Sequence, residues 1–147
     1  MLQQIRNRRG FTLIEIMVVI VILAALAALL GPKIIGRSDD AKLTDAKLQI
    51  RNLETALKLY KLDNGIYPTT EQGLQSLLTK PTVGMIPKNW RTGGYLEGKN
   101  LPKDPWGTDF VYLAPGEHGD YDLCSFGVDG VKGGEGQGAD ICNWNIQ

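Results

Sequence analysis

A glycine-dense segment near the C-terminus carries the residues best suited to bind a cation. Residues 129–140 hold three carboxylates, at Asp129, Glu135 and Asp140. The glycines among them leave the backbone free to turn its carbonyl oxygens inward, and calcium takes about six to eight oxygen ligands in a flexible geometry. The residue order does not match the calcium loop of an EF-hand. From the residues alone, a calcium loop and a solvated acidic loop both remain open.

Cys124 and Cys142, the only two cysteines, flank this acidic segment. A disulfide between them would close the segment and stabilise the fold by about 3 kcal/mol in the chain-entropy model. Two buried free thiols are the alternative. An oxidising compartment favours the disulfide, so the choice depends on where this part of the chain lies.

One carboxylate, Glu15, interrupts an apolar run from Phe11 to Leu30. A charge inside a membrane span is costly, about 3 kcal/mol on insertion scales, and usually has a partner. A positive group on another copy of the chain, such as a free amine at its Phe11, would supply that partner. A solvated carboxylate at the membrane interface is the alternative.

The sequence offers little for catalysis or for nucleic acid. It has one histidine, His118, which we expect to be a solvated loop residue, and it lacks the common metalloprotease, hydrolase and phosphate-loop motifs. We therefore expect no enzyme, and a membrane-tethered enzyme or binding module is only a minor alternative. With 16 basic and 16 acidic residues the net charge is +0, which predicts no nucleic-acid partner.

The apolar run itself predicts a transmembrane helix. Helical residues from Phe11 to Leu30 would rise about 30 Å, the thickness of the hydrocarbon core of a bilayer. Arginines within residues 6–9 precede the run, so the positive-inside rule places the N-terminus in the cytoplasm. A secretory signal peptide, with a shorter apolar core and a small-x-small cleavage site, is the alternative.

A second helical pattern follows the Gly31-Pro32 pair, where proline would kink or locally melt a helix. From residue 33 to 62, apolar side chains recur at helical spacing at Ala46, Ile50, Leu53, Leu57 and Tyr60. This stripe predicts an amphipathic helix that faces a core. We expect one long helix, with a membrane half and a half that forms the spine of the outer domain.

The rest of the chain predicts a small antiparallel sheet packed on that helix, which gives an α+β fold. A Thr69–Gln72 capping box begins a short helix over 71–78. Residues 83–100 form a loop, and 109–114 and 121–126 alternate as strands do around a hairpin loop at 115–119.

Residues 9–15, with the sequence RGFTLIE, resemble the class III signal of type IV pilins and type II secretion pseudopilins. The resemblance implies that a membrane prepilin peptidase cuts between Gly10 and Phe11 and methylates the new amine of Phe11. It also implies that Glu15 sets the register between subunits of a filament. The corresponding divisions are a cleaved leader peptide (1–10), a transmembrane and polymerisation helix (11–31) and a periplasmic domain (32–147).

Further segments are similar to the major pseudopilin of type II secretion, which has a type IV pilin-like fold. They include IYPTTEQGL at 66–74, LPKDPWG at 101–107, YLAPG at 112–116 and GVDG at 127–130. That family binds one structural calcium in the C-terminal loop. The resemblance makes the side chains of Asp129 and Asp140 and the carbonyls of Phe126 and Val131 its ligands.

Two features of this loop depart from the family or stay open. Glu135 is unassigned as a ligand, because the loop varies in length between members. The usual major pseudopilin has glycine in place of Cys142 and no cysteine at position 124, whereas type IV pilins commonly carry a C-terminal disulfide-bounded loop. A disulfide here would therefore stabilise the loop together with the calcium ion, so the loop would depend less on calcium.

The resemblance implies a major structural subunit that polymerises into a periplasmic pseudopilus and helps drive folded exoproteins through an outer-membrane channel. The implied partners are further copies of the chain, minor pseudopilins, the prepilin peptidase and an inner-membrane assembly platform, with its cytoplasmic ATPase acting indirectly. The implied location is the bacterial inner membrane, with a single span and a periplasmic C-terminal domain. A type IV pilin for adhesion, motility or DNA uptake is the alternative.

Overall fold

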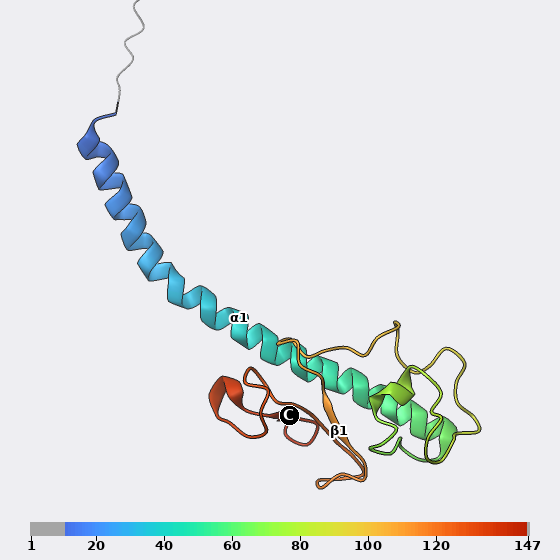
Figure 1. The fold of residues 1–147 in the computed structure, drawn as a ribbon. Helices are drawn as coiled ribbons and strands as arrows, with labels where there is room; N and C mark the ends of the chain where they lie inside the picture. Colours follow the sequence, from blue (N-terminus) through green and yellow to red (C-terminus); the bar gives the residue numbers. More distant parts are fainter. Residues whose placement is uncertain (1–10, 147) are drawn as a thin grey trace, which may run out of the picture. The chain divides into compact units, whose positions relative to one another are not determined.

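The structure, a computed structural model, describes residues 11–146, apart from the side chains of residues 29–38 and Gln137 (Figure 1). The predicted leader peptide, with Gly10, lies outside the described residues, as do the side chains of Leu30 and Pro32. The chain divides into two compact units, Met1–Ser38 and Asp39–Gln147. Each unit is described by itself below.

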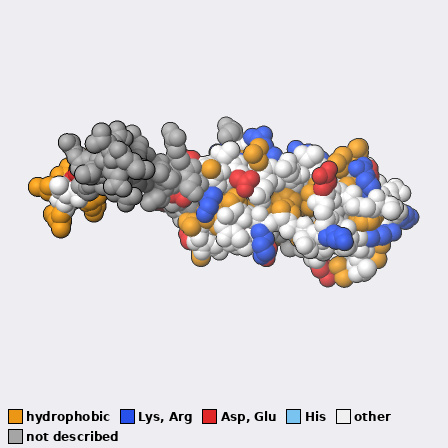
Figure 2. Space-filling view, turned by 90° about the horizontal axis from the view of Figure 1, so that it is seen from above, with side chains coloured by type: hydrophobic (Ala, Val, Ile, Leu, Met, Phe, Trp, Pro, Cys, Tyr) orange, Lys and Arg blue, Asp and Glu red, His pale blue; other side chains and the backbone are white. Residues whose placement is uncertain are grey.

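The first unit consists of the start of helix α1 (Leu13–Asn64). Its described side chains, from Phe11 to Ala28, are all exposed. Figure 2 shows these hydrophobic side chains in orange at the N-terminal end of the described chain. Within the described part of the chain, no helix is both long enough and apolar enough to span a bilayer.

The second unit is built around the remainder of α1, whose apolar stripe is buried. Ala46, Ile50, Leu53, Leu57 and Tyr60 are each at most 1% exposed, which confirms the predicted core-facing stripe. The helix ends at Asn64, and Gly65 follows with a φ of 83°. This left-handed conformation favours glycine, as expected for a helix C-terminus.

A three-stranded antiparallel sheet packs in the same unit, in the order β1-β2-β3 (Figure 1). Its strands are β1 (Val111–Leu113), β2 (Asp122–Ser125) and β3 (Ile141–Cys142). Tyr112, Leu123 and Ile141 contribute one buried side chain per strand to the core around α1. The two predicted strands are confirmed, although shorter than expected, and β3 was not predicted because two residues carry no measurable periodicity.

The segment between α1 and the sheet is mostly irregular. The predicted Thr69–Gln72 capping box is confirmed, since the Gln72 amide donates to Thr69 Oγ1 (3.3 Å) and the Thr69 amide donates to Gln72 Oε1 (3.1 Å). The short helix predicted over 71–78 is confirmed in part: a 3-10 helix, η1 (Leu74–Leu77), forms there. Gly73 has a φ of 60° and a ψ of −172°, which interrupts an α-helical backbone. A second 3-10 helix, η2 (Gly136–Gly138), lies between β2 and β3.

Candidate functional site

In the loop between β2 and β3, the carboxylate of Asp129, a predicted calcium ligand, packs beside the backbone of two glycines, Gly134 and Gly138. Asp129 Oδ1 accepts a hydrogen bond from the Val131 amide at 3.1 Å. A Cβ atom at Gly138 would lie 2.8 Å from Asp129 Oδ2, and one at Gly134 would lie 3.2 Å from it. Side chains at these two positions would crowd the carboxylate, so the glycines leave it room inside the loop.

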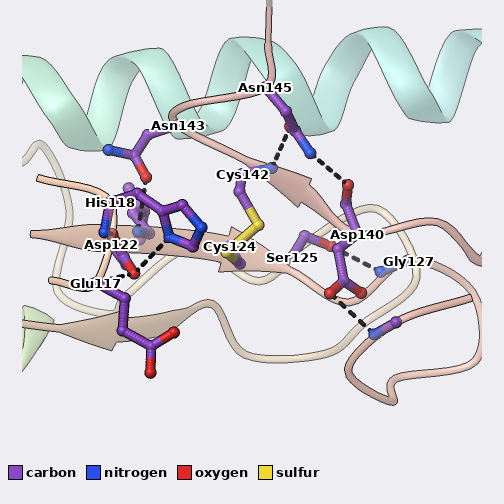
Figure 3. The surroundings of a disulfide bond; sticks show 12 residues. Glu117, His118, Asp122, Cys124, Ser125, Gly127, Asp140, Cys142, Asn143 and Asn145 are labelled. Carbon is purple, nitrogen blue, oxygen red and sulfur yellow. Dashed lines mark hydrogen bonds and ion pairs between the residues drawn. A yellow bond between two sulfur atoms is a disulfide. The ribbon is translucent and has the colours of Figure 1, made fainter.

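The carboxylate of Asp140 enters the same loop from its C-terminal end (Figure 3). Asp140 Oδ2 accepts a hydrogen bond from the Gly133 amide at 2.9 Å. Asp140 Oδ1 is buried and has no hydrogen-bond partner among the described residues. A buried charged oxygen without a partner is costly, so this atom is suited to a cation.

The arrangement fits calcium by the chemistry of its donors. Asp129 and Asp140 offer carboxylate oxygens, and the glycine-rich backbone offers carbonyl oxygens, the donors that calcium prefers. Among the described side chains, Glu135 does not join the two aspartates in a cluster of three ligand atoms within 4.8 Å of one another. The carbonyl ligands expected at Phe126 and Val131 remain predictions.

A different cluster of potential metal ligands consists of Glu117 and His118 in the β1–β2 loop and Asp122, the first residue of β2. Asp122 accepts hydrogen bonds from the Glu117 amide (2.9 Å) and the His118 amide (3.1 Å), and its Oδ2 lies 3.0 Å from His118 Nδ1. Burial raises the pKa of Asp122, but the bonds from the His118 ring and the two amides hold this pKa below its ordinary value. Both oxygens of this carboxylate therefore accept hydrogen bonds from residues of the β1–β2 loop.

His118 also contacts the C-terminal segment, which the sequence did not indicate. Its ring stacks on Trp144, with ring centroids 3.8 Å apart and planes 10° apart. His118 lies in the expected loop and is exposed, but its ring also makes two specific contacts, to Asp122 and Trp144, which the sequence did not predict. A contact between two residues far apart in the chain, such as this stack, leaves no local periodic signal in the sequence.

Cys124 and Cys142 form a disulfide. They are direct partners in the register of β2 and β3, so the bridge joins the two strands at the base of the acidic loop (Figure 3). Both residues are buried. The structure therefore favours the disulfide over two free thiols.

Side-chain hydrogen bonds also fix the residues that follow Cys142 in the chain. The side chain of Asn143 accepts from the Leu123 amide at 2.9 Å and donates to the Tyr121 carbonyl at 3.3 Å. Asn145 donates to the Asp140 carbonyl at 3.0 Å and accepts from the Cys142 amide at 2.8 Å. The position of Asp140 thus depends on the turn that follows it.

At the other end of the chain, Glu15 caps the helix that contains it. The Glu15 amide donates to Thr12 Oγ1 at 3.3 Å, and the Thr12 amide donates to Glu15 Oε2 at 3.4 Å. This reciprocal capping box satisfies two free amides at the start of α1. The T-x-x-E spacing could have predicted it, but sequence reasoning considered a partner on another chain or a solvated carboxylate at the membrane interface. Phe11 is 76% exposed beside this cap.

Two protein families match the sequence. The family described as type II secretion system (T2SS), protein G matches residues 33–144. A prokaryotic N-terminal methylation motif matches residues 5–31. The two matches together span the predicted processing site, α1 and the acidic loop.

Individual relatives cover almost the whole chain. The type II secretion system core protein G of Vibrio cholerae serotype O1 is 53% identical, over 99% of this chain and 98% of the relative. The protein of the same name from Pseudomonas aeruginosa is 55% identical, over 97% of this chain and 99% of the relative. The crystal structure of the major pseudopilin from the type 2 secretion system of enterohaemorrhagic Escherichia coli superposes with a TM-score of 0.67 at 45% identity. The superposition covers 76% of this chain and 94% of the pseudopilin chain.

Proposed function

The chain belongs to the type II secretion system protein G family, and from this premise we propose that it polymerises as the major subunit of a pseudopilus that helps drive folded exoproteins out of the cell. The observation that carries the proposal is the 53% sequence identity to a core protein G relative, which extends over 99% of the chain. The likeness to a solved major pseudopilin supports this assignment over a type IV pilin. The family is structural, and we propose no catalytic role.

The N-terminal methylation motif supports maturation by a prepilin peptidase. Cleavage between Gly10 and Phe11 would free the Phe11 amine, which the peptidase would then methylate. Glu15 already accepts a hydrogen bond from the Thr12 amide of its own chain. In the filament its carboxylate would instead pair with the Phe11 amine of a neighbouring copy, because an apolar bundle leaves a lone charge uncompensated.

The exposed apolar side chains of the first unit need a nonaqueous partner before and after assembly. Ile14 is 70% exposed and Val21 is 66% exposed, and most of the other exposed side chains of this segment are also apolar. Before assembly, residues 11–31 would lie in the inner membrane, with residues 32–147 in the periplasm. In the filament, the same residues of other copies would cover them, and small side chains such as Ala24 and Ala27 would let the helices approach closely.

The remaining partners follow from this assembly route. An inner-membrane platform would extract the subunit, its cytoplasmic ATPase acting indirectly, and minor pseudopilins would share the filament. α1 would serve as the spine that connects the packed membrane half to the outer domain. No nucleic acid has a role in this scheme.

The acidic loop would hold one structural calcium ion. Asp129 and Asp140 would bind it with their side chains, and Phe126 and Val131 with their carbonyl oxygens, while the role of Glu135 stays open. The unpartnered Oδ1 of Asp140 and the room left by Gly134 and Gly138 support this assignment. When bound, the ion neutralises the two carboxylates and holds the loop closed; the loop activates no water.

Complementation tests the proposed function. The full chain is expressed in bacteria that lack their own protein G but retain the rest of the secretion system. We expect release of a secreted enzyme into the medium, and a mature N-terminus at methylated Phe11 by mass spectrometry. Surface filaments or motility without secretion would contradict the proposal and favour a type IV pilin.

Two variants separate processing from assembly in this assay. Gly10→Val should leave the leader attached, whereas Glu15→Gln should be cleaved normally but form no filament. Glu97→Gln removes the same charge from an exposed site of the second unit and serves as the matched control. Filaments of normal length and number from the Glu15→Gln variant would remove the proposed role of Glu15 in registration.

A further inference from the structure

The acidic loop is attached at both ends to a very short pair of strands. β2 ends at Ser125 and β3 begins at Ile141, so residues 126–140 hang from two register pairs, Cys124↔Cys142 and Ser125↔Ile141. β3 has only 2 residues. Isolated pairing of this length is marginal, so contacts beyond the strand pairing, such as the Asn143 bonds to Leu123 and Tyr121, contribute to holding the two ends of the loop together.

The disulfide is the covalent contact among these, and it lies close to a proposed calcium ligand. Asp140 directly precedes β3, and Cys142 is the second residue of that strand. The Cys142 amide donates to Asn145 Oδ1, and Asn145 Nδ2 donates to the Asp140 carbonyl. Bridge, turn and carboxylate therefore form one connected unit (Figure 3).

We infer that the Cys124–Cys142 bridge positions the calcium loop, so that forming the bridge raises calcium affinity and bound calcium protects the bridge from reduction. Without the bridge, β3 can separate from β2 and the carboxylate of Asp140 moves with it. Calcium binding would then include the entropy cost of ordering this segment. The inference rests on the proposed calcium loop.

Thermodynamic reciprocity makes the inference stringent. If the bridge changes the calcium dissociation constant by some factor, calcium must change the equilibrium constant for reduction by the same factor. Reduction by dithiothreitol transfers two electrons and two protons to the bridge, giving two cysteine thiols and the cyclic disulfide of the reagent. Cys142 is 1% exposed and Cys124 is 7% exposed, so the reagent reaches the sulfurs through local opening, which calcium should suppress.

Calcium titration of the full chain in detergent micelles tests the first half. Calorimetry gives the dissociation constant for the oxidised chain, the reduced chain and a Cys124→Ala/Cys142→Ala variant, with circular dichroism to verify that each is folded. We expect the reduced chain and the variant to bind calcium about tenfold more weakly, which corresponds to about 1.4 kcal/mol. Equal dissociation constants would overturn the coupling and leave the calcium loop intact.

The redox equilibrium tests the second half even if the reduced chain unfolds. The oxidised fraction is measured in dithiothreitol buffers of graded potential, with calcium and with chelator. We expect calcium to shift the equilibrium toward the bridge by the same factor of about ten, and to have no effect in an Asp129→Asn variant. An unchanged equilibrium overturns the coupling, whereas failure of the oxidised wild-type chain to bind calcium overturns both the coupling and the calcium loop.

Discussion

Two loops on the same sheet hold an aspartate in opposite ways. At the end of the β1–β2 loop, Asp122, the first residue of β2, accepts its hydrogen bonds from two backbone amides of that loop and from the His118 ring. In the β2–β3 loop, Asp140 receives one bond from the Gly133 amide and keeps a buried oxygen without a partner among the described residues. Both oxygens of the first carboxylate accept hydrogen bonds, whereas the second keeps one oxygen available to the proposed cation. Completeness of hydrogen bonding thus separates the loops better than counting acidic residues does.

Calcium removal should give the largest difference between the two loops. A ligand at a hundred times its dissociation constant stabilises the folded state by about 2.7 kcal/mol. We expect chelator to lower the thermal midpoint of the full chain in micelles, Asp140→Asn to abolish this response, and Asp122→Asn to retain it. A full calcium response in Asp140→Asn would contradict the contrast between the two aspartates.

Removing the bridge is expected to have an effect of about the same size as removing calcium. The Cys124→Ala/Cys142→Ala variant should lose about 3 kcal/mol of unfolding free energy in chelator, since the unfolded chain gains the entropy of an open loop. Urea unfolding followed by tryptophan fluorescence measures this loss. A Cys→Ala change at both sites that left the stability unchanged would show that β2 and β3 hold the loop without the disulfide.

Asp122→Asn should destabilise the second unit by about 1–3 kcal/mol, with or without calcium, because the Glu117 and His118 amides lose a charged acceptor. The pKa of Asp122 is lowered in the folded chain. Its stabilising contribution is therefore complete above the unfolded pKa of about 4 and disappears as the pH falls through the lower folded pKa. Urea midpoints measured between neutral and acidic pH should show a smaller acid-dependent loss in Asp122→Asn than in the wild-type chain.

The groups facing Asp122 define the control for this pH profile. They are His118, whose ring contacts the carboxylate, and Glu117, whose side chain lies in the same cluster. A Glu117→Gln variant should keep the acid profile of the wild-type chain, since its backbone amide still donates to Asp122. Parallel acid profiles for Asp122→Asn and the wild-type chain would show that this carboxylate does not contribute to acid sensitivity.

The sequence predicted the parts of this fold that repeat or that lie close in the chain. The α1 stripe follows the helical period, and the Thr69–Gln72 box is a local spacing, so both were found. The acidic loop was recognised because Asp129 and Asp140 stand among glycines. β3 was missed because its two residues owe their conformation to pairing with β2. The His118–Trp144 stack was missed because it joins positions far apart in the chain, and only folding reveals such a contact.

That stack carries the smallest predicted effect and connects the two loops. His118 lies in the β1–β2 loop beside Asp122, and its ring stacks on Trp144. Trp144 lies in the turn that follows Cys142. In the same turn, Asn145 donates a hydrogen bond to the Asp140 carbonyl. An aromatic pair contributes about 0.5–1.5 kcal/mol beyond buried area. His118→Ala should therefore destabilise the second unit by about 1 kcal/mol in urea and weaken calcium binding by at most a few fold. His118→Phe, which can still stack on Trp144 but cannot bond Asp122, should restore the calcium affinity without restoring the acid profile. If neither variant changes calcium affinity, the two loops are independent and only the bridge positions Asp140.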